Sequence, residues 1–263
     1  MISPVSPASP LAERPTVSVV IPMYNERENI AHSLAFVSEA VGRCASEHEI
    51  IVVDDASTDD SPDIVAKAAS RDPHIRVVRN ERNRKLGGTL RAGFAAARYE
   101  LVLYTDADLP ADPRDLERAI RAMRLTRADL VAGYRFDRVP EGYRRAIYSV
   151  VYNTLIRLLF HWPCRDINFA FKLVRRRVLE AVELRAEGSL IDAELVVKAK
   201  NAGFVVQQIG LDYFPRSFGQ SNLASPAIVV KILRELFTLY GEMRRPRIRI
   251  GPKAAPPLAA PPE

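Results

Sequence analysis

Cysteine is scarce in this chain of 263 residues, which contains only Cys44 and Cys164. Two cysteines are too few for the disulfide framework of a small secreted protein, and a reducing cytosol is the simplest setting for them. Neither cysteine lies in a CxxC or Cys/His spacing, so a zinc site is not expected. Disulfide-rich and zinc-stabilised classes of protein are therefore disfavoured.

Long apolar stretches are also missing. No run of about 18 apolar residues occurs, so no membrane-spanning helix is predicted. Residues 1–15 are rich in proline and serine and have neither a basic start nor an apolar stretch, which predicts a disordered leader and no signal peptide. Residues 251–263 have a similar bias towards proline and alanine and are expected to form a disordered tail.

Two common nucleotide-binding fingerprints are absent as well. There is no GKS or GKT phosphate loop, which removes the commonest ATPase interpretation. Gly87, Gly88 and Gly93 have the wrong spacing for a dinucleotide-binding loop, and no strand leads directly into them. A hydride-transfer function therefore loses its main support.

What remains is the composition of an ordinary globular protein, with 48% hydrophobic and 27% charged residues. The formal net charge of +6 suits an anionic partner, which can be nucleic acid, lipid head groups or a phosphorylated substrate. Nucleic acid is not expected, because the arginines do not alternate with aromatics as in a stacking platform and no helix-turn-helix or finger spacing appears. A non-catalytic binding module is therefore the weakest of the interpretations considered.

Short runs rich in β-branched residues alternate with segments of helical length. The strand candidates are residues 17–21, 50–53, 75–78, 101–104 and 130–131, and helices are expected to begin near Asn29, Ser61, Thr89 and Pro113. Ser61 has the features of a helix N-cap, since Pro62 follows it at the first helical position. This alternation predicts an α/β fold with a mainly parallel central sheet and helices on both faces.

Polar segments follow three of the predicted strands. They are Pro22-Met23-Tyr24-Asn25-Glu26, Asp54-Asp55-Ala56-Ser57-Thr58-Asp59 and Asp106-Ala107-Asp108-Leu109-Pro110. Because ligands of such sheets bind beyond the carboxyl ends of the strands, we expect the three segments to meet at one rim. Simpler roles are open for some of these residues: Asp54 and Asp55 could cap the next helix, and Tyr24 and Glu26 could be a turn aromatic and a first-turn acid.

Asp106 and Asp108 are the candidate metal ligands. If the backbone stays extended, strand alternation sends both carboxylates in one direction. Two carboxylates suit Mg²⁺ or Mn²⁺, which keep open positions for water and for the phosphates of a nucleotide diphosphate. Such an ion would offset the charge of a departing diphosphate. An isolated DxD is equally compatible with a solvated turn or a helix cap.

The ordered segments together resemble one known family. They read VSVVIPMYNERENI, IIVVDDASTDDS, LVLYTDADLP, GYRFDR, RDINFAFKLVRR, IDAEL and YFPRSFGQSNL. Over roughly residues 17–222 the chain resembles the inverting family 2 glycosyltransferases with a GT-A fold, and is most similar to the polyprenyl-phosphate branch that includes dolichyl-phosphate mannosyltransferase. The resemblance implies transfer of a hexose from a GDP- or UDP-linked donor with Mg²⁺ or Mn²⁺.

The resemblance also implies roles for individual residues. Those matching the surroundings of the nucleobase and ribose are Pro22, Tyr24, Glu26, Val53 and Asp55; those matching the metal and diphosphate motif are Asp106, Ala107 and Asp108, with Asp108 as the direct ligand. Arg135 matches an arginine beside the donor phosphates. Arg144 or Arg145 matches a basic contact near the reacting phosphates, and Arg216 lies in the segment that closes over the substrates.

Asp192 falls where many relatives carry the acid that acts as base. It could instead cap the helix expected to run through Glu194 and Lys198. A polyprenyl phosphate is already ionised near neutral pH and needs no strong base, whereas a sugar hydroxyl acceptor has a greater need of one.

The chain departs from the pattern of this branch at three places. Pro110 stands where mannosyltransferases of this kind often have glutamine, so the sugar is left open. Phe169-Ala170 replaces the usual Ser-Gly pair, and the closing loop reads Phe218-Gly219-Gln220-Ser221-Asn222 where a basic segment is usual. The acceptor is thereby left open too, with a soluble or glycan hydroxyl as the alternative to a polyprenyl phosphate.

Two stretches combine apolar residues at helical spacing with basic residues. They are residues 144–162 and residues 228–240, the second followed by Arg244, Arg245, Arg247 and Arg249. Both can pack on the core, but the resemblance favours peripheral contact with an anionic membrane at its cytosolic face. The expected organisation is thus a catalytic domain over residues 16–223, followed by an amphipathic basic helix and segment over residues 224–250.

Overall fold

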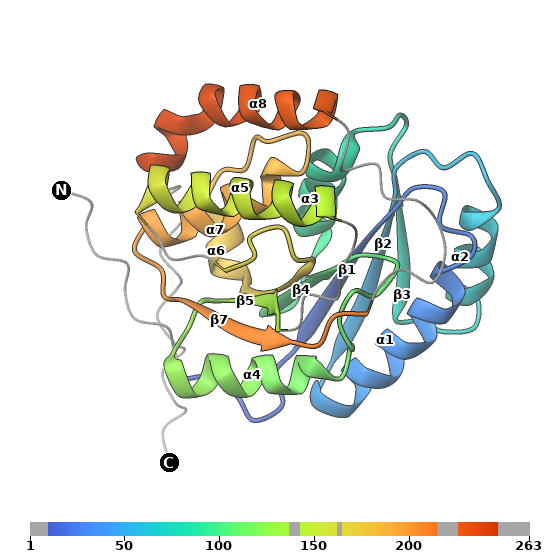
Figure 1. Ribbon diagram of the computed structural model, residues 1–263. Helices are drawn as coiled ribbons and strands as arrows, with labels where there is room; N and C mark the ends of the chain where they lie inside the picture. Colours follow the sequence, from blue (N-terminus) through green and yellow to red (C-terminus); the bar gives the residue numbers. More distant parts are fainter. Residues whose placement is uncertain (1–9, 137–142, 162–164, 215–225, 247–263) are drawn as a thin grey trace, which may run out of the picture.

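The computed structural model describes residues 10–136, 143–161, 165–214 and 226–246 of the chain. In that part, seven strands form one sheet in the order β3-β2-β1-β4-β6-β5-β7 (Figure 1). The strands are β1 (Val17–Met23), β2 (His48–Asp54), β3 (Ile75–Arg79), β4 (Leu101–Thr105), β5 (Leu130–Arg135), β6 (Phe171–Arg175) and β7 (Val206–Leu211). The helices are α1 (Ile30–Cys44), α2 (Ser61–Ala69), α3 (Lys85–Ala96), α4 (Asp115–Thr126), α5 (Tyr143–Phe160), α6 (Arg176–Ala181), α7 (Leu190–Asn201) and α8 (Pro226–Arg244).

The sheet is mainly parallel, as the sequence predicts. β6 runs antiparallel to its neighbours β4 and β5, whereas the pairs β1–β2, β1–β4, β2–β3 and β5–β7 are parallel. The strands β1, β2, β4 and β5 therefore end at the same edge of the sheet. The segments that follow them share that rim.

Helices cover both faces of the sheet, and alternation along the strands divides the core in two. On one face Val20, Val53, Val102 and Tyr104 pack with residues of α3, α5, α7 and α8. On the other face Val19, Ile21, Val52 and Leu103 pack with residues of α1 and α4. The strands are buried on both faces, which explains why the sequence runs that predict them are almost continuously apolar.

The element boundaries differ from the predicted ones in three ways. The predicted strands are extended by one or more residues, most of all 130–131, which becomes Leu130–Arg135. α3 begins at Lys85 and not near Thr89, because Gly87 and Gly88 lie inside the helix; a Cβ on Gly87 would sit 2.0 Å from the Ala186 carbonyl oxygen. The N-cap of α2 is Asp60 and not Ser61, whose hydroxyl accepts a hydrogen bond from the Glu26 N–H.

The N-terminal segment is ordered over a longer stretch than the sequence predicts. Residues 10–15 lie against the body of the protein, where Leu11 joins the core that contains α1 and α4. The Arg14 guanidinium donates to the carbonyl oxygens of Gly42 and Ala45, at 3.0 and 2.9 Å. The expected disordered leader of residues 1–15 is therefore wrong for residues 10–15, and residues 1–9 lie outside the described part.

The two predicted amphipathic stretches form α5 and α8, and both are helical. Their inner residues, which include Ile156, Phe160, Leu236 and Met243, join the core shared with α3 and α7. Within the described residues, none of the helices is both long enough and apolar enough to cross a membrane. Each of the two helices packs on the protein with one side and exposes the other, as at Leu158 of α5 and Phe237 of α8.

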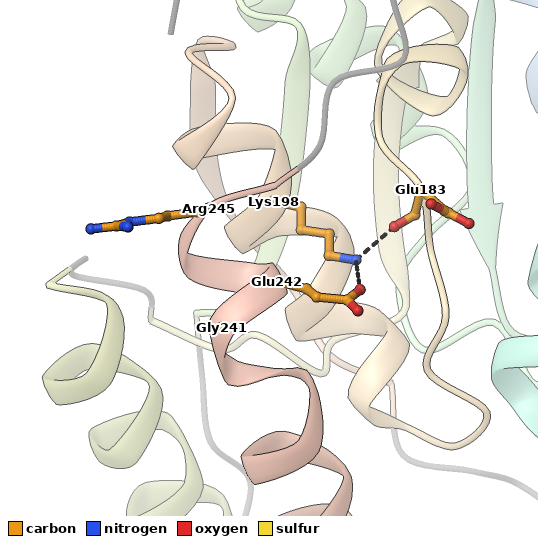
Figure 2. Close-up of a pocket in the computed structure, with 5 residues that line it drawn as sticks. All are labelled: Glu183, Lys198, Gly241, Glu242 and Arg245. Carbon is orange, nitrogen blue, oxygen red and sulfur yellow. Dashed lines mark hydrogen bonds and ion pairs between the residues drawn. The ribbon is translucent and has the colours of Figure 1, made fainter. Parts of the chain in front are cut away.

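α8 is held against α7 by charged groups as well as by apolar ones. Figure 2 shows the buried Lys198 of α7 beside Glu242 of α8, with Glu183 opposite. The Lys198 Nζ donates to Glu194 Oε1 at 2.6 Å and to the Glu183 carbonyl oxygen at 2.7 Å, and lies 3.9 Å from Glu242 Oε2. Arg185 forms a further ion pair with Glu242, with Nη1 2.8 Å from Oε1. The end of α8 is thereby fixed to α7 and to the segment that precedes it.

Candidate active site at the carboxyl rim of the sheet

Hydrogen bonds join the first two polar segments directly and tie the third to α1. The Asp55 N–H donates to the Met23 carbonyl oxygen at 2.8 Å, and the Asn25 N–H donates to Ser57 Oγ at 3.0 Å. The Ser33 hydroxyl of α1 donates to the carbonyl oxygen of Ala107. The segments after β1 and β2 are thus bonded to each other, and the segment after β4 is bonded to the helix that follows the first of them.

The two aspartates at the end of β2, Asp54 and Asp55, form hydrogen bonds to the neighbouring loops, and neither caps α2. Asp54 Oδ1 accepts from the Ser57 N–H at 2.9 Å, and its other oxygen lies 3.3 Å from the Nε of Arg79. Asp55 Oδ1 accepts from Asn80 Nδ2 and from the Arg84 N–H, both at 2.8 Å. Asp55 is therefore fixed by the loop that precedes α3, and Asn80 and Arg84 are neighbours of the site that the sequence pattern did not single out.

The other residues expected around the nucleobase differ in their access to a ligand. Tyr24 is 48% exposed and Pro22 is half-buried, so both side chains can contact a bound ring. Glu26 Oε2 accepts from Asn29 Nδ2 at 2.8 Å, just before α1. Val53 is completely buried and packs on Gly93 of α3. A Cβ added to Gly93 would lie only 3.0 Å from Val53 Cγ2. The Val53 side chain belongs to the core.

Asp106 and Asp108 lie on a turn and not on an extended strand end. β4 stops at Thr105, the Leu109 N–H donates to the Asp106 carbonyl oxygen at 3.2 Å, and Leu109 has a positive φ of 48°. The alternation that was expected to align the two carboxylates therefore does not apply. Both are half-buried, and Ala107 between them is buried.

A buried polar group lies beneath this turn. The Tyr104 hydroxyl donates to Asp106 Oδ1 at 3.0 Å. On the neighbouring strand β6, Lys172 stands opposite Tyr104 in the antiparallel register, and its Nζ lies 5.5 Å from the centre of the Tyr104 ring. The same Nζ donates to Asp192 Oδ1 at 2.5 Å and to the Phe169 carbonyl oxygen at 2.8 Å. Three elements, β4, β6 and α7, thus meet below Asp106.

The pKa shifts reflect the crowding of acids around this point. Burial raises the pKa of Tyr104 well above its usual value, and the nearby charges of Asp106, Asp192 and Asp108 raise it further. Burial also raises the pKa of Asp192, against the lowering effect of the Lys172 ammonium, and the charge of Asp166 adds to the rise. Asp192 is 3% exposed and lies in the first turn of α7, whose N-cap is Ser189.

Arg135 ends β5 and is engaged by a second buried acid. Its Nε donates to Asp166 Oδ2 at 2.6 Å and its Nη2 to Asp166 Oδ1 at 3.2 Å, and the guanidinium carbon lies 5.2 Å from the centre of the Tyr213 ring. Asp166 and Lys172 belong to the RDINFAFKLVRR segment, but neither was predicted to be a site residue. A lysine flanked by apolar residues on a buried strand is the signal that could have done so.

Three of the expected site residues, Arg144, Arg145 and Arg216, cannot be placed by side chain. Arg144 and Arg145 lie in the first turn of α5, where only the backbone is described. Arg216 lies outside the described residues, as does the closing loop around it.

The donor set at the rim fits a hard divalent cation in part. Asp106 and Asp108 supply carboxylate oxygens, the ligands that Mg²⁺ and Mn²⁺ prefer. Among the described residues, three or more histidine, cysteine, aspartate or glutamate side chains do not gather in a cluster able to hold a metal. A cation here would therefore need ligands from water or from a bound diphosphate.

Comparisons with known proteins identify the class of this protein. The model of glycosyl transferase family 2 matches residues 18–183, and the chain belongs to this family. It is 32% identical to polyprenol monophosphomannose synthase of Mycolicibacterium smegmatis over 83% of this chain and 86% of that protein. The matched segments include those that form the rim.

Two further relatives are longer proteins. The chain is 33% identical to the glycosyltransferase AglD of Haloferax volcanii over 92% of its own length but 40% of that protein. It is 28% identical to undecaprenyl-phosphate 4-deoxy-4-formamido-L-arabinose transferase of Pseudomonas savastanoi pv. phaseolicola, over 84% of this chain and 64% of that one. The chain thus spans less than two thirds of the length of these two relatives.

Solved structures agree with the expected fold. Glucosyl-3-phosphoglycerate synthase of Mycobacterium tuberculosis, crystallised with Mn²⁺, UDP-glucose and phosphoglyceric acid, superposes with a TM-score of 0.69 at 19% identity, covering 86% of this chain and 80% of that one. A further mycobacterial protein gives a TM-score of 0.70 at 22% identity, over 86% of this chain and 75% of the other. The GT-A fold is therefore confirmed.

Proposed function

We propose that this protein transfers a hexose from a GDP- or UDP-linked donor to a polyprenyl phosphate, with inversion at the anomeric carbon and with Mg²⁺ or Mn²⁺ at Asp106 and Asp108. The observation that carries the proposal is the position of the Asp106–Asp108 turn and the Asp55 segment at one rim, after strands that run parallel to their shared neighbour β1. This arrangement gives a donor one place for its base and another for its diphosphate. Glucosyl-3-phosphoglycerate synthase, which shares the fold, was crystallised with Mn²⁺ and UDP-glucose.

Each part of the rim has a task in this reaction. Tyr24 and Asp55 flank the base and ribose, and Asp106 and Asp108 face the diphosphate. A bound divalent ion supplies electrostatic stabilisation to the leaving diphosphate. Arg135, Arg145 and Arg216 are proposed as the basic contacts of the donor and acceptor phosphates. The two hydrogen bonds from Arg135 to Asp166 hold the guanidinium plane in one orientation, which prepares it to bind a phosphate.

The surroundings of Asp192 favour a phosphate acceptor over a hydroxyl. A general base has to come within about 3 Å of the proton that it removes. Asp192 is 3% exposed and Lys172 occupies one of its oxygens, so it is poorly placed to meet an incoming hydroxyl. A phosphate that is already ionised needs no such base. The names of polyprenol monophosphomannose synthase and the undecaprenyl-phosphate transferase support the same acceptor class.

The test combines donor, acceptor and metal in one assay. The purified protein is incubated with membranes and a panel of labelled GDP- and UDP-sugars, with and without chelator, and the label that partitions into organic solvent is counted. We expect one donor to give chelator-sensitive label in the organic phase. Label found only on a water-soluble glycan would select the hydroxyl acceptor instead.

The Asp108→Ala variant tests the proposed metal site. We expect it to lose transfer, by roughly a hundredfold or more, because the diphosphate loses its charge-stabilising partner. Glu117→Ala, which removes an exposed carboxylate from α4, is the control and should retain transfer. Circular dichroism of both variants checks the fold. Full activity of Asp108→Ala with an intact fold would refute the role assigned to this residue.

A further inference from the structure

The group beneath Asp106 is built from charges that are expensive to bury. Lys172 is 1% exposed and Asp192 is 3% exposed, and their ion pair is enclosed between β6 and α7. Desolvation of such a pair offsets much of its Coulomb attraction, and apolar residues of similar volume are often as stable in its place. Stability alone therefore gives a weak reason for these charges at this point.

The position of Lys172 and Asp192 relative to Tyr104 gives a better reason for these buried charges. Lys172 reaches over the Tyr104 ring, with Nζ 5.5 Å from the ring centre, while two of its contacts, Asp192 Oδ1 and the Phe169 carbonyl oxygen, anchor the ammonium. A cation over an aromatic face attracts the ring and restricts its tilt. The hydroxyl at the far end of that ring donates to Asp106 Oδ1 at 3.0 Å.

We propose that Tyr104, Lys172 and Asp192 form a positioning unit for the Asp106 carboxylate, in which the buried ion pair fixes the Tyr104 ring and the ring hydroxyl orients the carboxylate towards a divalent cation. The inference rests on the proposed function, because it assumes that Asp106 binds this cation. Hydrogen bonds to a ligating carboxylate typically change metal affinity by about 10- to 100-fold when they are lost. Tyr104 and Lys172 are positioning residues and do not themselves contact the substrates.

Metal binding without turnover tests the unit directly. The dissociation constant of Mn²⁺ is measured by electron paramagnetic resonance in the presence of UDP or GDP and without acceptor. Tyr104→Phe keeps the ring and removes only the hydroxyl, and we expect its Mn²⁺ dissociation constant to rise about tenfold or more. Tyr240→Phe, which removes a hydroxyl from α8, is the matched control and should bind as the wild type does. Equal Mn²⁺ affinity in both variants would overturn the proposal.

A second pair of variants separates positioning from folding. Lys172→Met alone leaves the Asp192 carboxylate buried without its cation and is expected to lower the thermal midpoint strongly. The double variant Lys172→Met/Asp192→Leu removes both charges and should regain most of that midpoint. We expect the double variant to bind Mn²⁺ about as weakly as Tyr104→Phe does. A stable double variant with wild-type Mn²⁺ affinity would show that the pair serves only the fold.

Asp108→Ala distinguishes a failure of this inference from a failure of the proposed function. If Asp108→Ala leaves Mn²⁺ binding unchanged, the metal site itself is wrong and the positioning unit falls with it. If Asp108→Ala weakens Mn²⁺ binding while Tyr104→Phe does not, the metal site stands and only the positioning role is refuted.

Discussion

Single residues decide how closely α3 approaches its neighbours. Gly87 lies where this helix touches the segment before α7, and its N–H donates to the Glu187 carbonyl oxygen at 2.8 Å. Gly93, two turns further on, lies against Val20 and Val53 of the sheet, so that any Cβ would be 2.4 Å from Val20 Cγ1. Gly87 and Gly93, which fail as part of a nucleotide-binding fingerprint, thus allow α3 to pack closely on the segment before α7 and on the sheet.

Substitution of Gly87 by alanine should show this close approach. The added Cβ would lie 2.0 Å from a backbone carbonyl oxygen, which cannot move without shifting the 186–187 segment. We expect Gly87→Ala to lower the free energy of unfolding by about 1–3 kcal/mol, measured by urea denaturation.

Gly42→Ala is the matched control for this prediction. Gly42 lies in α1, and a Cβ there would meet nothing closer than His48 Cε1 at 3.9 Å. Alanine should therefore stabilise the helix by about 0.5–1 kcal/mol. The assignment of Gly87 to close packing would be wrong if both variants changed stability by the same amount.

Residues of the site were predictable where sequence order determines their place. Asp55, Asp106 and Asp108 each follow a buried strand, and parallel strands bring such residues to one rim without further information. Tyr104 and Lys172 were not predictable in the same way. They meet because β6 inserts antiparallel beside β4, and that register depends on tertiary packing between positions that are far apart in the sequence.

At the scale of elements, local sequence patterns again predict some features, whereas others depend on contacts between residues far apart in the sequence. The five strand candidates and the four helix starts come from local periodicity, and all nine elements exist. The strands β6 and β7 were not predicted, because their sequences FKLVR and VQQIGL contain charged or amide side chains that interrupt an apolar run. Their polar residues are satisfied by partners on other elements, such as Lys172 by Asp192, which periodicity cannot reveal.

The outward sides of α5 and α8 have a composition that suits an anionic membrane surface. Leu158 of α5 and Phe237 of α8 are 69% and 71% exposed, and Val151 and Val230 are also exposed. In the described part of both helices the exposed residues include arginine and lysine. The two glutamates of α8 have partners on the protein: Glu235 accepts from the Glu187 N–H, and Glu242, whose side chain is 42% exposed, pairs with Arg185.

Charge reversal on α8 tests the proposed contact with an anionic membrane. We expect Arg234→Glu/Arg244→Glu to weaken binding to vesicles containing phosphatidylglycerol by about tenfold or more, since each basic residue near an anionic surface contributes about 1 kcal/mol. Vesicle co-sedimentation at low salt measures the effect. Arg118→Glu/Arg121→Glu makes the same change in net charge on α4, which covers the other face of the sheet. Equal losses in the two double variants would attribute binding to net charge and not to the α8 face.

For the whole molecule, several arginines have structural partners at the edge of the sheet opposite the candidate active site. Glu49, at the start of β2, is buried and pairs with Arg76 at 2.7 Å and with Arg98 at 3.0 Å. Arg177 pairs with the buried Asp129 before β5. The net charge of +6 is therefore not in itself a measure of affinity for an anionic partner. What matters is which cations remain exposed and on which face.

The same edge should make the protein sensitive to acid in two stages. His48 begins β2 and stacks on His74, with ring centres 4.3 Å apart. Burial lowers the pKa of His48 below its ordinary value of 6.5, the neighbouring His74 lowers it further, and Asp72 opposes both. The unfolded chain therefore takes up the His48 proton more readily than the folded one. The free energy of unfolding should fall as the pH drops below about 6.5 and level off once the lowered pKa is passed.

A second loss follows at lower pH from the carboxylates. Burial raises the pKa of Glu49, but hydrogen bonds from Ser18, from the Arg98 N–H and from the Arg76 guanidinium outweigh it and leave the pKa below its ordinary 4.5. Such a group stabilises the fold above its ordinary pKa, and this stabilisation disappears as the pH falls through the lowered value. Urea midpoints measured between pH 8 and pH 3 separate the two stages. His48→Phe keeps an aromatic ring stacked on His74 and should remove only the loss of stability at the higher pH. His32→Gln, on the exposed side of α1, is the control and should leave both losses in place. If His48→Phe still loses stability at the higher pH, another group is responsible for that loss.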